Sequence, residues 1–331
     1  MDSTLCMAEV ALGVGGMREG LTPGMDALLR RIEAASSAPF HALSAQEARA
    51  QYERRAEVLD LPRAVIPEVL DLQLPMRDGA ARRARLYRPQ GPHASNSRPA
   101  LLYFHGGGFT VGSLETHDSL CRQLALRSGA DVMAFDYRLA PEHRFPQAVH
   151  DCEDALHHLV EEGAQWGIDA DRLAVGGDSA GGTLAAVVAL LARDHGWLLR
   201  LQLLITPGTA AMADSESHRR YAQGYLLDAQ TIEWFFSHYI SHPERSNWRF
   251  APLLAQTHEG VASAAVLLAE CDPLVDEGMA YADRLRWAGV PVDLHIGRGM
   301  VHDFIKMGRA LKEAQQAQSW CAEQMRAALM D

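Results

Sequence analysis

Short apolar runs and longer segments of helical periodicity alternate along most of this chain. A run that is apolar throughout, or at every second position, predicts a strand buried on two faces or on one. Apolar residues three and four positions apart predict instead a helix with one buried face, as at Met25, Leu28, Leu29 and Ile32. The predicted strands cover residues 69–74, 84–87, 101–104, 132–135, 172–175, 201–205, 264–269 and 290–296. The predicted helices cover residues 20–50, 148–162, 183–192, 232–240 and 278–288.

This order of elements predicts the fold class. Strands that alternate with helices are typical of α/β proteins, whose central sheet is mostly parallel and is flanked by helices. At 331 residues the chain can bury a large core, and α/β enzymes of this size are often single domains. A polar break at 209–224 and an aromatic helix at 232–240 interrupt the alternation, which indicates an insertion into the core.

Composition and charge narrow the class of protein. The hydrophobic share of 48% and the charged share of 22% are those of an ordinary globular protein. The net charge of −11 disfavours nucleic acids and anionic membrane surfaces as partners, and no apolar run is long enough to span a bilayer. The first residues include early acids and no basic stretch, so a cytoplasmic location is expected. Scattered reduced thiols, with no metal-binding spacing, are expected for Cys6, Cys121, Cys152, Cys271 and Cys321.

One short segment carries a candidate nucleophile. Residues 177–181 read Gly-Asp-Ser-Ala-Gly, with a predicted strand before them and a helix of small residues after them. Strand, serine turn and helix in this order are the context of a nucleophile elbow. The turn is tight, which accounts for Gly177 and Gly181 on either side of Ser179. It exposes the serine hydroxyl and directs the backbone N–H of Ala180 toward the same space, while Asp178 is expected to hydrogen-bond loop backbone and support the turn.

A glycine loop follows the predicted strand at 101–104. It consists of His105, Gly106, Gly107 and Gly108. A backbone without Cβ atoms can approach a ligand closely and present its N–H groups. Loops of this type supply part of the oxyanion hole in enzymes that have the serine elbow.

The elbow requires a base and an acid, and these follow the serine in the order acid, then histidine. After the predicted strand at 264–269 the chain has two histidines, and His302 is favoured because His295 lies inside a predicted strand. Asp272 follows that strand at its carboxyl end, where ligand-facing groups of open α/β sheets are found. Asp276, four residues later, is the rival and is interpreted as a helix N-cap. Glu270 is expected to end the strand.

Six ordered segments together resemble the hormone-sensitive lipase-like family of α/β-hydrolases, also called bacterial esterase family IV. The resemblance extends from the glycine loop to near the C-terminus and is highly specific, whereas a lone G-x-S-x-G would be weak evidence. The segments are 105–109, 136–142, 177–181, 251–254, 272–274 and 302–304.

The resemblance implies a carboxylester hydrolase that forms an acyl-enzyme and acts on small esters with short to medium acyl chains, without a metal or an organic cofactor. Amide or peptide hydrolysis by the same groups, and a non-catalytic receptor on the same fold, are the alternatives; the presence of His302 argues against the receptor. The implied triad is Ser179, Asp272 and His302. The implied oxyanion donors are the backbone N–H groups of Gly106, Gly107 and Ala180, supported by His105, Gly108, Gly177, Asp178 and Gly181.

The resemblance also implies an organisation and a partner. A helical cap is expected to form from residues 1–50 and the insertion at 207–245, and the catalytic core from 51–206 and 246–331. A homodimer is expected through the last strand, at 290–296. One departure is Asp303, where relatives commonly have glycine. A second carboxylate beside His302 is expected to raise the pKa of that histidine.

Overall fold

A sheet of eight strands forms the centre of the computed structural model, which describes residues 17–35, 38–91 and 97–330. The strands are β1 (Glu68–Pro75), β2 (Ala81–Arg88), β3 (Arg98–Phe104), β4 (Asp131–Phe135), β5 (Ile168–Asp178), β6 (Leu201–Ile205), β7 (Ala264–Ala269) and β8 (Val292–Gly297). Their order across the sheet is β1-β2-β4-β3-β5-β6-β7-β8. The pairs β1–β2 and β2–β4 are antiparallel, and the remaining neighbours are parallel. All eight predicted strands, and the mostly parallel sheet, are therefore confirmed.

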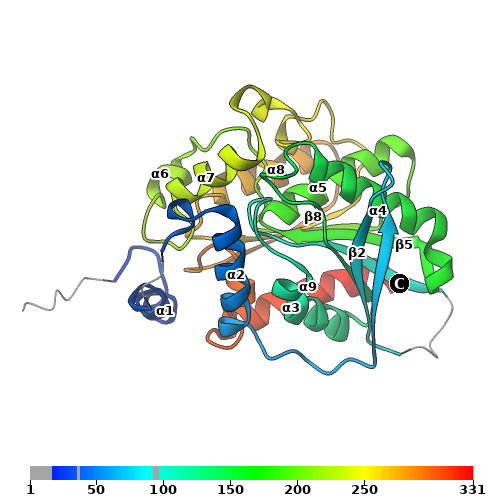
Figure 1. The fold of residues 1–331 in the computed structure, drawn as a ribbon, viewed down its shortest axis with the longest axis horizontal. Helices are drawn as coiled ribbons and strands as arrows, with labels where there is room; N and C mark the ends of the chain where they lie inside the picture. The colour runs from blue at the N-terminus through cyan, green and yellow to red at the C-terminus, as the bar shows by residue number, and fades with distance from the viewer. Residues whose placement is uncertain (1–16, 36–37, 92–96, 331) are drawn as a thin grey trace, which may run out of the picture.

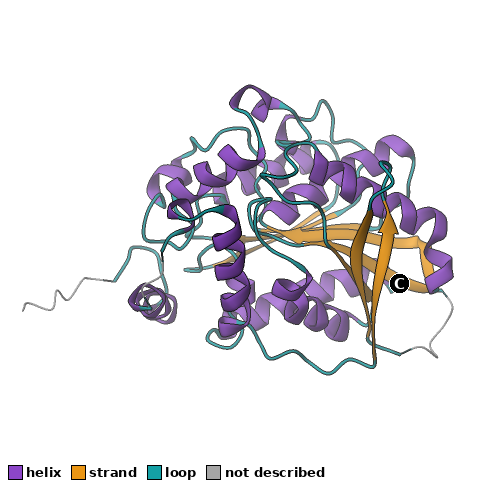
Figure 2. Ribbon diagram, viewed as in Figure 1, coloured by secondary structure: helices purple, strands orange, loops and turns teal. Residues whose placement is uncertain are grey.

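Helices cover both faces of this sheet (Figures 1 and 2). One face carries α3 (Leu114–Ser128) and α9 (Lys312–Leu329), and the other carries α4 (Gln147–Glu162), α5 (Ala180–His195) and α8 (Val275–Trp287). Each face has its own apolar core, because successive strand side chains point to opposite sides. In β3, for example, Leu102 and Phe104 belong to one core and Leu101 and Tyr103 to the other.

The segment before the sheet departs from the expected single helix at 20–50. It forms two helices, α1 (Pro23–Ala34) and α2 (Ala45–Leu59), and between them a 3₁₀ turn, η1 (Phe40–Ala42). The break has local causes: Pro39 precedes the turn, and Ser44 caps α2 in a capping box with Glu47. The predicted boundary between cap and core at residue 50 falls inside α2. Residues 1–16 of the predicted cap, and Cys6 with them, lie outside the described residues.

The insertion after β6 contains α6 (Glu216–Arg220) and α7 (Ala229–Tyr239). The aromatic helix predicted at 232–240 is therefore confirmed, with its start capped by Asp228. In Figure 1, α7 and the N-terminal segment that contains η1 and α2 lie at the same end of the sheet. The contact between α7 and this segment is aromatic and is made by η1: the ring of Phe40 lies 6.0 Å from that of Phe235 and 6.3 Å from that of Trp234. The two predicted parts of the cap thus contact each other.

Among the α-helices of the described residues, α3, α9 and the short α6, which lies in the polar break at 209–224, were not predicted. The buried stripe of α9 begins with small or polar residues, Ala314, Ala317 and Gln318, and larger apolar residues enter it only toward its end, at Met325 and Leu329.

In α3, polar residues are buried, among them His117 and Asp118. The same helix buries Leu120 and Leu124 at helical spacing, but these polar residues interrupt its apolar stripe. His117 is held by Asp178 at 3.0 Å beside the serine turn, whereas Asp118 accepts from the Tyr87 hydroxyl and pairs with arginines away from it.

Candidate active site

Ser179 occupies the turn between β5 and α5. Its backbone has φ 52° and ψ −121°, in a region that residues with a side chain rarely adopt. The strain is sustained by close packing, since a Cβ at Gly181 would lie 2.0 Å from the carbonyl oxygen of Phe104. The Ser179 N–H donates to the carbonyl of Ile205 at 2.8 Å, which ties the turn to the neighbouring strand β6. The strand, turn and helix predicted around this serine are confirmed.

A continuous chain of hydrogen bonds joins Ser179 to a histidine and an aspartate. His302 Nε2 lies 2.9 Å from Ser179 Oγ, and His302 Nδ1 lies 2.7 Å from Asp272 Oδ2. The other oxygen of Asp272 accepts from the backbone N–H of Leu274 at 2.9 Å, which fixes the carboxylate plane. Asp272 is 1% exposed and His302 6%, so the aspartate–histidine pair is shielded from water. The structure brings the three predicted catalytic residues together.

The rival residues lie elsewhere. His295 is in β8, and its ring packs against Trp320 at 5.3 Å. Asp276 is the second residue of α8, whose N-cap is Leu274, so the N-cap interpretation is wrong. Its carboxylate instead accepts from the Ser217 N–H at 2.8 Å and anchors the insertion. Glu270 directly follows β7, as expected.

His302 is flanked by a second carboxylate. Asp303 has a left-handed backbone with φ 54°, and its Oδ2 lies 3.7 Å from His302 Nε2. Its Oδ1 accepts from Thr206 Oγ1 at 2.9 Å. Burial alone lowers the pKa of His302, but the charges of Asp272 and Asp303 outweigh burial and raise this pKa to about 9. The expected effect of Asp303 on the histidine is thus in the predicted direction.

The glycine loop lies beside the elbow, but one predicted donor points away from it. The Gly106 N–H donates to Asp178 Oδ1 at 3.1 Å, and a Cβ at Gly106 would lie 2.3 Å from Asp178 Oδ2. Gly106 therefore anchors the loop to Asp178 and has no N–H to offer a substrate, which corrects the expectation. Among the described residues, no acceptor is found for the N–H groups of Gly107, Gly108 and Ala180.

A buried aromatic stack and the half-buried Arg49 hold the glycine loop in place. His105 stacks on Tyr137 with ring centroids 4.3 Å apart, and the Tyr137 hydroxyl donates to the His105 carbonyl at 2.7 Å. Burial lowers the pKa of His105 to about 4, so its ring is neutral. Arg49 of α2 donates to the carbonyls of Thr110 at 2.8 Å and of Ala140 at 2.6 Å. The 136–142 loop also supports the glycine loop, since the Ala140 N–H donates to the Phe109 carbonyl at 2.8 Å.

A cavity of about 60 Å³ adjoins Ser179. Its walls are mostly apolar and come from the glycine loop, from α5 and from the insertion. Phe235 and Phe236 of α7 line it, whereas Tyr239 packs on Phe109 with ring centroids 4.0 Å apart. The aromatic helix therefore packs on the core with part of its surface and lines the cavity with another part. The lining residues are Gly108, Phe109, Ser179, Ala180, Thr183, Gly208, Ala210, Leu227, Ile232, Phe235, Phe236, Phe250, Leu274 and Glu277.

Glu277 adds a buried carboxyl to this cavity that sequence reasoning missed. Its Oε1 accepts from the N–H groups of Thr209 at 2.6 Å and Ala210 at 3.3 Å. Burial raises the pKa of Glu277 to about 8. The glutamate fixes the start of the insertion against α8. Its position in the first turn of a helix near Asp272 is the signal that could have found it.

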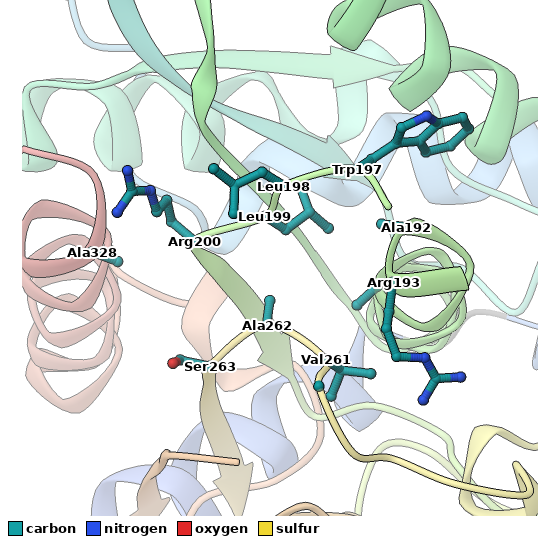
Figure 3. Close-up of a pocket in the computed structure, with 12 residues that line it drawn as sticks. Ala192, Arg193, Trp197, Leu198, Leu199, Arg200, Val261, Ala262, Ser263 and Ala328 are labelled. Atoms are coloured by element: carbon teal, nitrogen blue, oxygen red, sulfur yellow. The ribbon is translucent and has the colours of Figure 1, made fainter. Parts of the chain in front are cut away.

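A larger hollow of about 490 Å³ lies at the opposite end of the strands, beside the residues that precede β6 and β7 (Figure 3). Its lining includes one hydroxyl, that of Ser263, and neither a histidine nor an acid. Its arginines are committed to backbone carbonyls, Arg193 to Thr257 and Arg200 to Asp171. The chemistry therefore belongs to the smaller cavity beside Ser179.

Within residues 17–35, 38–91 and 97–330, no cluster of three or more metal-ligating side chains is found. No helix in the same part of the chain is long and apolar enough to span a membrane. A mostly parallel sheet, with a serine on a strained turn after β5 and a histidine and an aspartate after β8 and β7, defines an α/β-hydrolase.

Comparison with known proteins agrees. Residues 101–306 match a family described by the alpha/beta hydrolase fold. The chain is 47% identical over 302 residues to the ethyl acetate hydrolase of Pseudomonas putida, covering 89% of this chain and 95% of that protein. It is 35% identical over 255 residues to an arylesterase of Saccharolobus solfataricus, covering 76% and 82%. A solved α/β-hydrolase from the Lake Arreo metagenome superimposes with a TM-score of 0.91 at 37% identity, covering 95% of this chain and 100% of that one.

This chain belongs to the hormone-sensitive lipase-like family of α/β-hydrolases, and it is a carboxylesterase. The predicted family, fold class and enzyme class are confirmed.

Proposed function

We propose that this esterase hydrolyses short-chain carboxylic esters through Ser179, His302 and Asp272. The observation that carries the proposal is the unbroken hydrogen-bond chain from Asp272 through His302 to Ser179, next to an apolar cavity. A serine hydroxyl is a weak nucleophile until a base takes its proton. The geometry supplies that base at 2.9 Å and an acid that orients it at 2.7 Å.

The reaction has two halves. His302 Nε2 takes the hydroxyl proton while Ser179 Oγ bonds to the ester carbonyl carbon, and the carbonyl oxygen gains the negative charge. The tetrahedral intermediate then expels the alcohol, which leaves with the proton held by His302. Water next attacks the acyl-enzyme by the same route and releases the acid. Asp272 holds the imidazole in the tautomer whose Nε2 is free and stabilises the imidazolium.

The oxyanion is proposed to lie against the backbone N–H groups of Gly107, Gly108 and Ala180. Support for this assignment comes from their lack of an acceptor and from the commitment of the Gly106 N–H to Asp178. Each such donor is worth about 3–4 kcal/mol of transition-state stabilisation in other serine hydrolases. Donors fixed in the backbone need little reorganisation as the charge develops.

The cavity beside Ser179 favours a short acyl group. Its volume of about 60 Å³ is less than half that of a cavity able to hold one benzene molecule, about 150 Å³. Each CH₂ that enters gains about 0.8 kcal/mol, but a chain that outgrows the space meets packed aromatic rings. The relative named ethyl acetate hydrolase supports the same size class. We propose that α1, α2 and the 207–245 insertion act as the cap that limits this space.

The function is tested with nitrophenyl esters from acetate to dodecanoate. We expect kcat/KM to peak at acetate or butyrate and to fall at least about tenfold by dodecanoate, because the long chain clashes with the cap. Phe236→Ala, which enlarges the cavity, should move the optimum to longer chains. Trp234→Ala, on the same helix but outside the cavity lining, is the matched control and should keep the profile. Faster hydrolysis of dodecanoate than of butyrate by the unaltered enzyme would contradict the proposed size class.

The same esters separate ester from amide hydrolysis. Nitroanilides with identical acyl groups are expected to react far more slowly, since an amine is a poorer leaving group than a nitrophenolate. Comparable rates for the two series would favour the amidase alternative.

The acid side of the pH profile tests Asp303. His302 must be neutral to act as base, and its pKa is raised, so kcat/KM should rise with pH along a limb above the ordinary histidine value. Asp303→Asn removes one negative charge and preserves the local structure. The amide oxygen of asparagine can still accept from Thr206, and asparagine tolerates the left-handed backbone at this position. The limb should then move to lower pH by roughly one unit.

Asp293→Asn, an exposed aspartate on β8, makes the same change in net charge far from His302 and should leave the limb in place. If the acid limb of Asp303→Asn stays at the pH of the unaltered enzyme, Asp303 does not raise the pKa of His302.

A partner and a location are proposed as well. Strand β8 is the last strand of the sheet, and the nearby Trp287 is 80% exposed, which supports pairing with a second copy along 290–296. Sedimentation would show a dimer, and a monomer at micromolar concentration would contradict it. Cys121, Cys152, Cys271 and Cys321 are free and buried, which supports a reducing, cytoplasmic compartment.

A further inference from the structure

Behind the nucleophile lies a buried polar cluster that the reaction itself does not use. It comprises Tyr52 of α2, His117 of α3, Asp178 at the end of β5, and Lys306 at the end of a 3₁₀ turn, η5 (Phe304–Lys306). Lys306 is 8% exposed, His117 1% and Asp178 0%. Ionic groups at such depth destabilise a fold unless they are paired, so their contacts must be specific.

Lys306 joins helix α2 to the core. Its ammonium group donates to the Tyr52 hydroxyl at 2.9 Å and lies 4.9 Å from the centroid of the Tyr52 ring. On its other side it lies 3.1 Å from His117 Nε2. Lys306 follows His302 by four residues, so the cation belongs to the same loop as the catalytic base.

Asp178 joins this cluster to the glycine loop. Its Oδ2 lies 3.0 Å from His117 Nε2, and its Oδ1 accepts from the Gly106 N–H at 3.1 Å. Burial alone raises the pKa of Asp178, but the neighbouring His117 and Lys306 outweigh it and hold this pKa below its ordinary value, so the carboxylate is ionised. An ionised carboxylate is a strong acceptor for the amide that begins the loop.

Tyr52 also belongs to the aromatic contact between the two parts of the cap. Its ring lies 6.1 Å from that of Phe40, which contacts Phe235 of α7. One turn earlier on α2, Arg49 donates to the carbonyl of Thr110, two residues after the glycine loop. Helix α2 is therefore connected to both sides of the glycine loop. Arg49 bonds the residues that follow the loop, and Tyr52 is connected to its beginning through Lys306 and Asp178.

We propose that Tyr52 is a positioning residue, which couples docking of α2 to the geometry of the oxyanion loop through Lys306, His117 and Asp178. The proposal rests on the ester hydrolysis proposed above. When α2 is docked, the Tyr52 hydroxyl orders Lys306, the cation orders His117 and Asp178, and the carboxylate holds Gly106. The N–H groups of Gly107 and Gly108 follow directly and are thereby aimed at the oxyanion.

The predicted signature is a loss in kcat without a matching loss in ground-state binding. The negative charge on the oxygen is present in the transition state and not in the bound ester. An N–H group that points away from this oxygen therefore weakens binding of the transition state and leaves binding of the ester unchanged. A residue that merely stabilised the fold would lower the amount of active enzyme and leave kcat per active site unchanged.

The test uses Tyr52→Phe, which keeps the ring and removes the hydroxyl. With nitrophenyl butyrate, kcat per phosphonate-titrated site is expected to fall about tenfold while KM stays within about twofold. The inhibition constant of butylboronic acid, which forms a tetrahedral adduct on the serine, should rise by a similar factor. In a Lys306→Met background, Tyr52→Phe should have no further effect on kcat, because the tyrosine acts through the lysine.

Tyr225→Phe is the matched control. The Tyr225 hydroxyl also joins the insertion to the N-terminal segment, by donating to the Glu19 carbonyl at 3.1 Å, but it has no contact with the cluster. Its removal should leave kcat within about twofold of the unaltered enzyme. An unchanged kcat in Tyr52→Phe, or an equal loss in Tyr225→Phe, contradicts the proposal.

Hydrogen exchange supplies a readout that needs no turnover. The backbone amides of residues 106–112 should exchange faster in Tyr52→Phe than in Tyr225→Phe, since the loop loses one of its anchors. Equal exchange in the two variants contradicts the coupling even if the enzyme proves inactive on esters. Absence of ester hydrolysis by the unaltered enzyme, with the exchange difference present, would instead contradict the proposed function alone.

Discussion

Replacing Ser179 by alanine is expected to lower kcat for nitrophenyl butyrate by about 10⁶-fold, the scale found when a triad serine is removed from another serine hydrolase. The hydroxyl is the group that forms the acyl-enzyme, and alanine leaves His302 with no proton to take. The small residual rate should come from the oxyanion donors and from substrate binding. The measurement is steady-state kinetics, combined with a fluorophosphonate probe and peptide mass spectrometry to find the labelled serine.

Ser263 offers the control. It lines the larger hollow at the other end of the strands, and Ser263→Ala should keep full activity and full labelling. Labelling at any serine other than Ser179, or activity retained in Ser179→Ala, would contradict the assignment of the nucleophile.

The second large effect is expected from Asp272→Asn, with a loss in kcat on the order of 10⁴-fold. The reason lies in the two partners of this carboxylate. Asparagine can keep its oxygen toward the Leu274 N–H, and its NH₂ group then faces His302 Nδ1. That nitrogen must become the acceptor, so the proton moves to Nε2, where it blocks removal of the serine proton.

Asp276→Asn is the control, because it replaces a carboxylate oxygen of a nearby aspartate by an NH₂ group, as Asp272→Asn does. Its amide oxygen can still accept from the Ser217 N–H, so activity should stay within about threefold and stability within about 1 kcal/mol. The decisive outcome is which variant is inactive by kinetics while still folded by circular dichroism. An inactive Asp276→Asn beside an active Asp272→Asn would reverse the assignment of the acid.

The sequence was sufficient to predict the sheet and the positions of Ser179, Asp272 and His302, the three residues that hydrogen bonds join. The strands β3 and β7 are buried at every position, so their apolar runs are unmistakable. The order serine, then acid, then histidine along the chain left few candidates for the acid and the base. The carboxyl ends of parallel strands meet at one edge of the sheet, which favoured residues that directly follow a strand. Asp272 and His302 follow from these two facts, and Ser179 follows from the segment at 177–181 with a strand before it and a helix after it.

The errors share a physical cause, which is that polar partners distant in sequence decide local geometry. Gly106 was expected to face the substrate, but Asp178, 72 residues later, accepts its N–H. His117 was missed because polar residues on a helix are expected to face water, whereas this histidine is buried and faces the site. Lys306 was missed because a lone lysine after an apolar pair reads as a surface residue. Local rules fail where a site overrides them.

The hydrogen bond between Tyr52 and Lys306 also bears on how the molecule assembles. It joins residues 254 positions apart in the chain, so Tyr52 emerges long before Lys306 during synthesis. Closing so long a loop has a large entropic cost, which is met only after the sheet between the partners has formed. We therefore expect the amides of α2 to gain protection after those of the central strands in pulsed hydrogen exchange during refolding. The nascent chain would then hold its nucleophile in an incomplete site until the segment that carries Lys306 has folded.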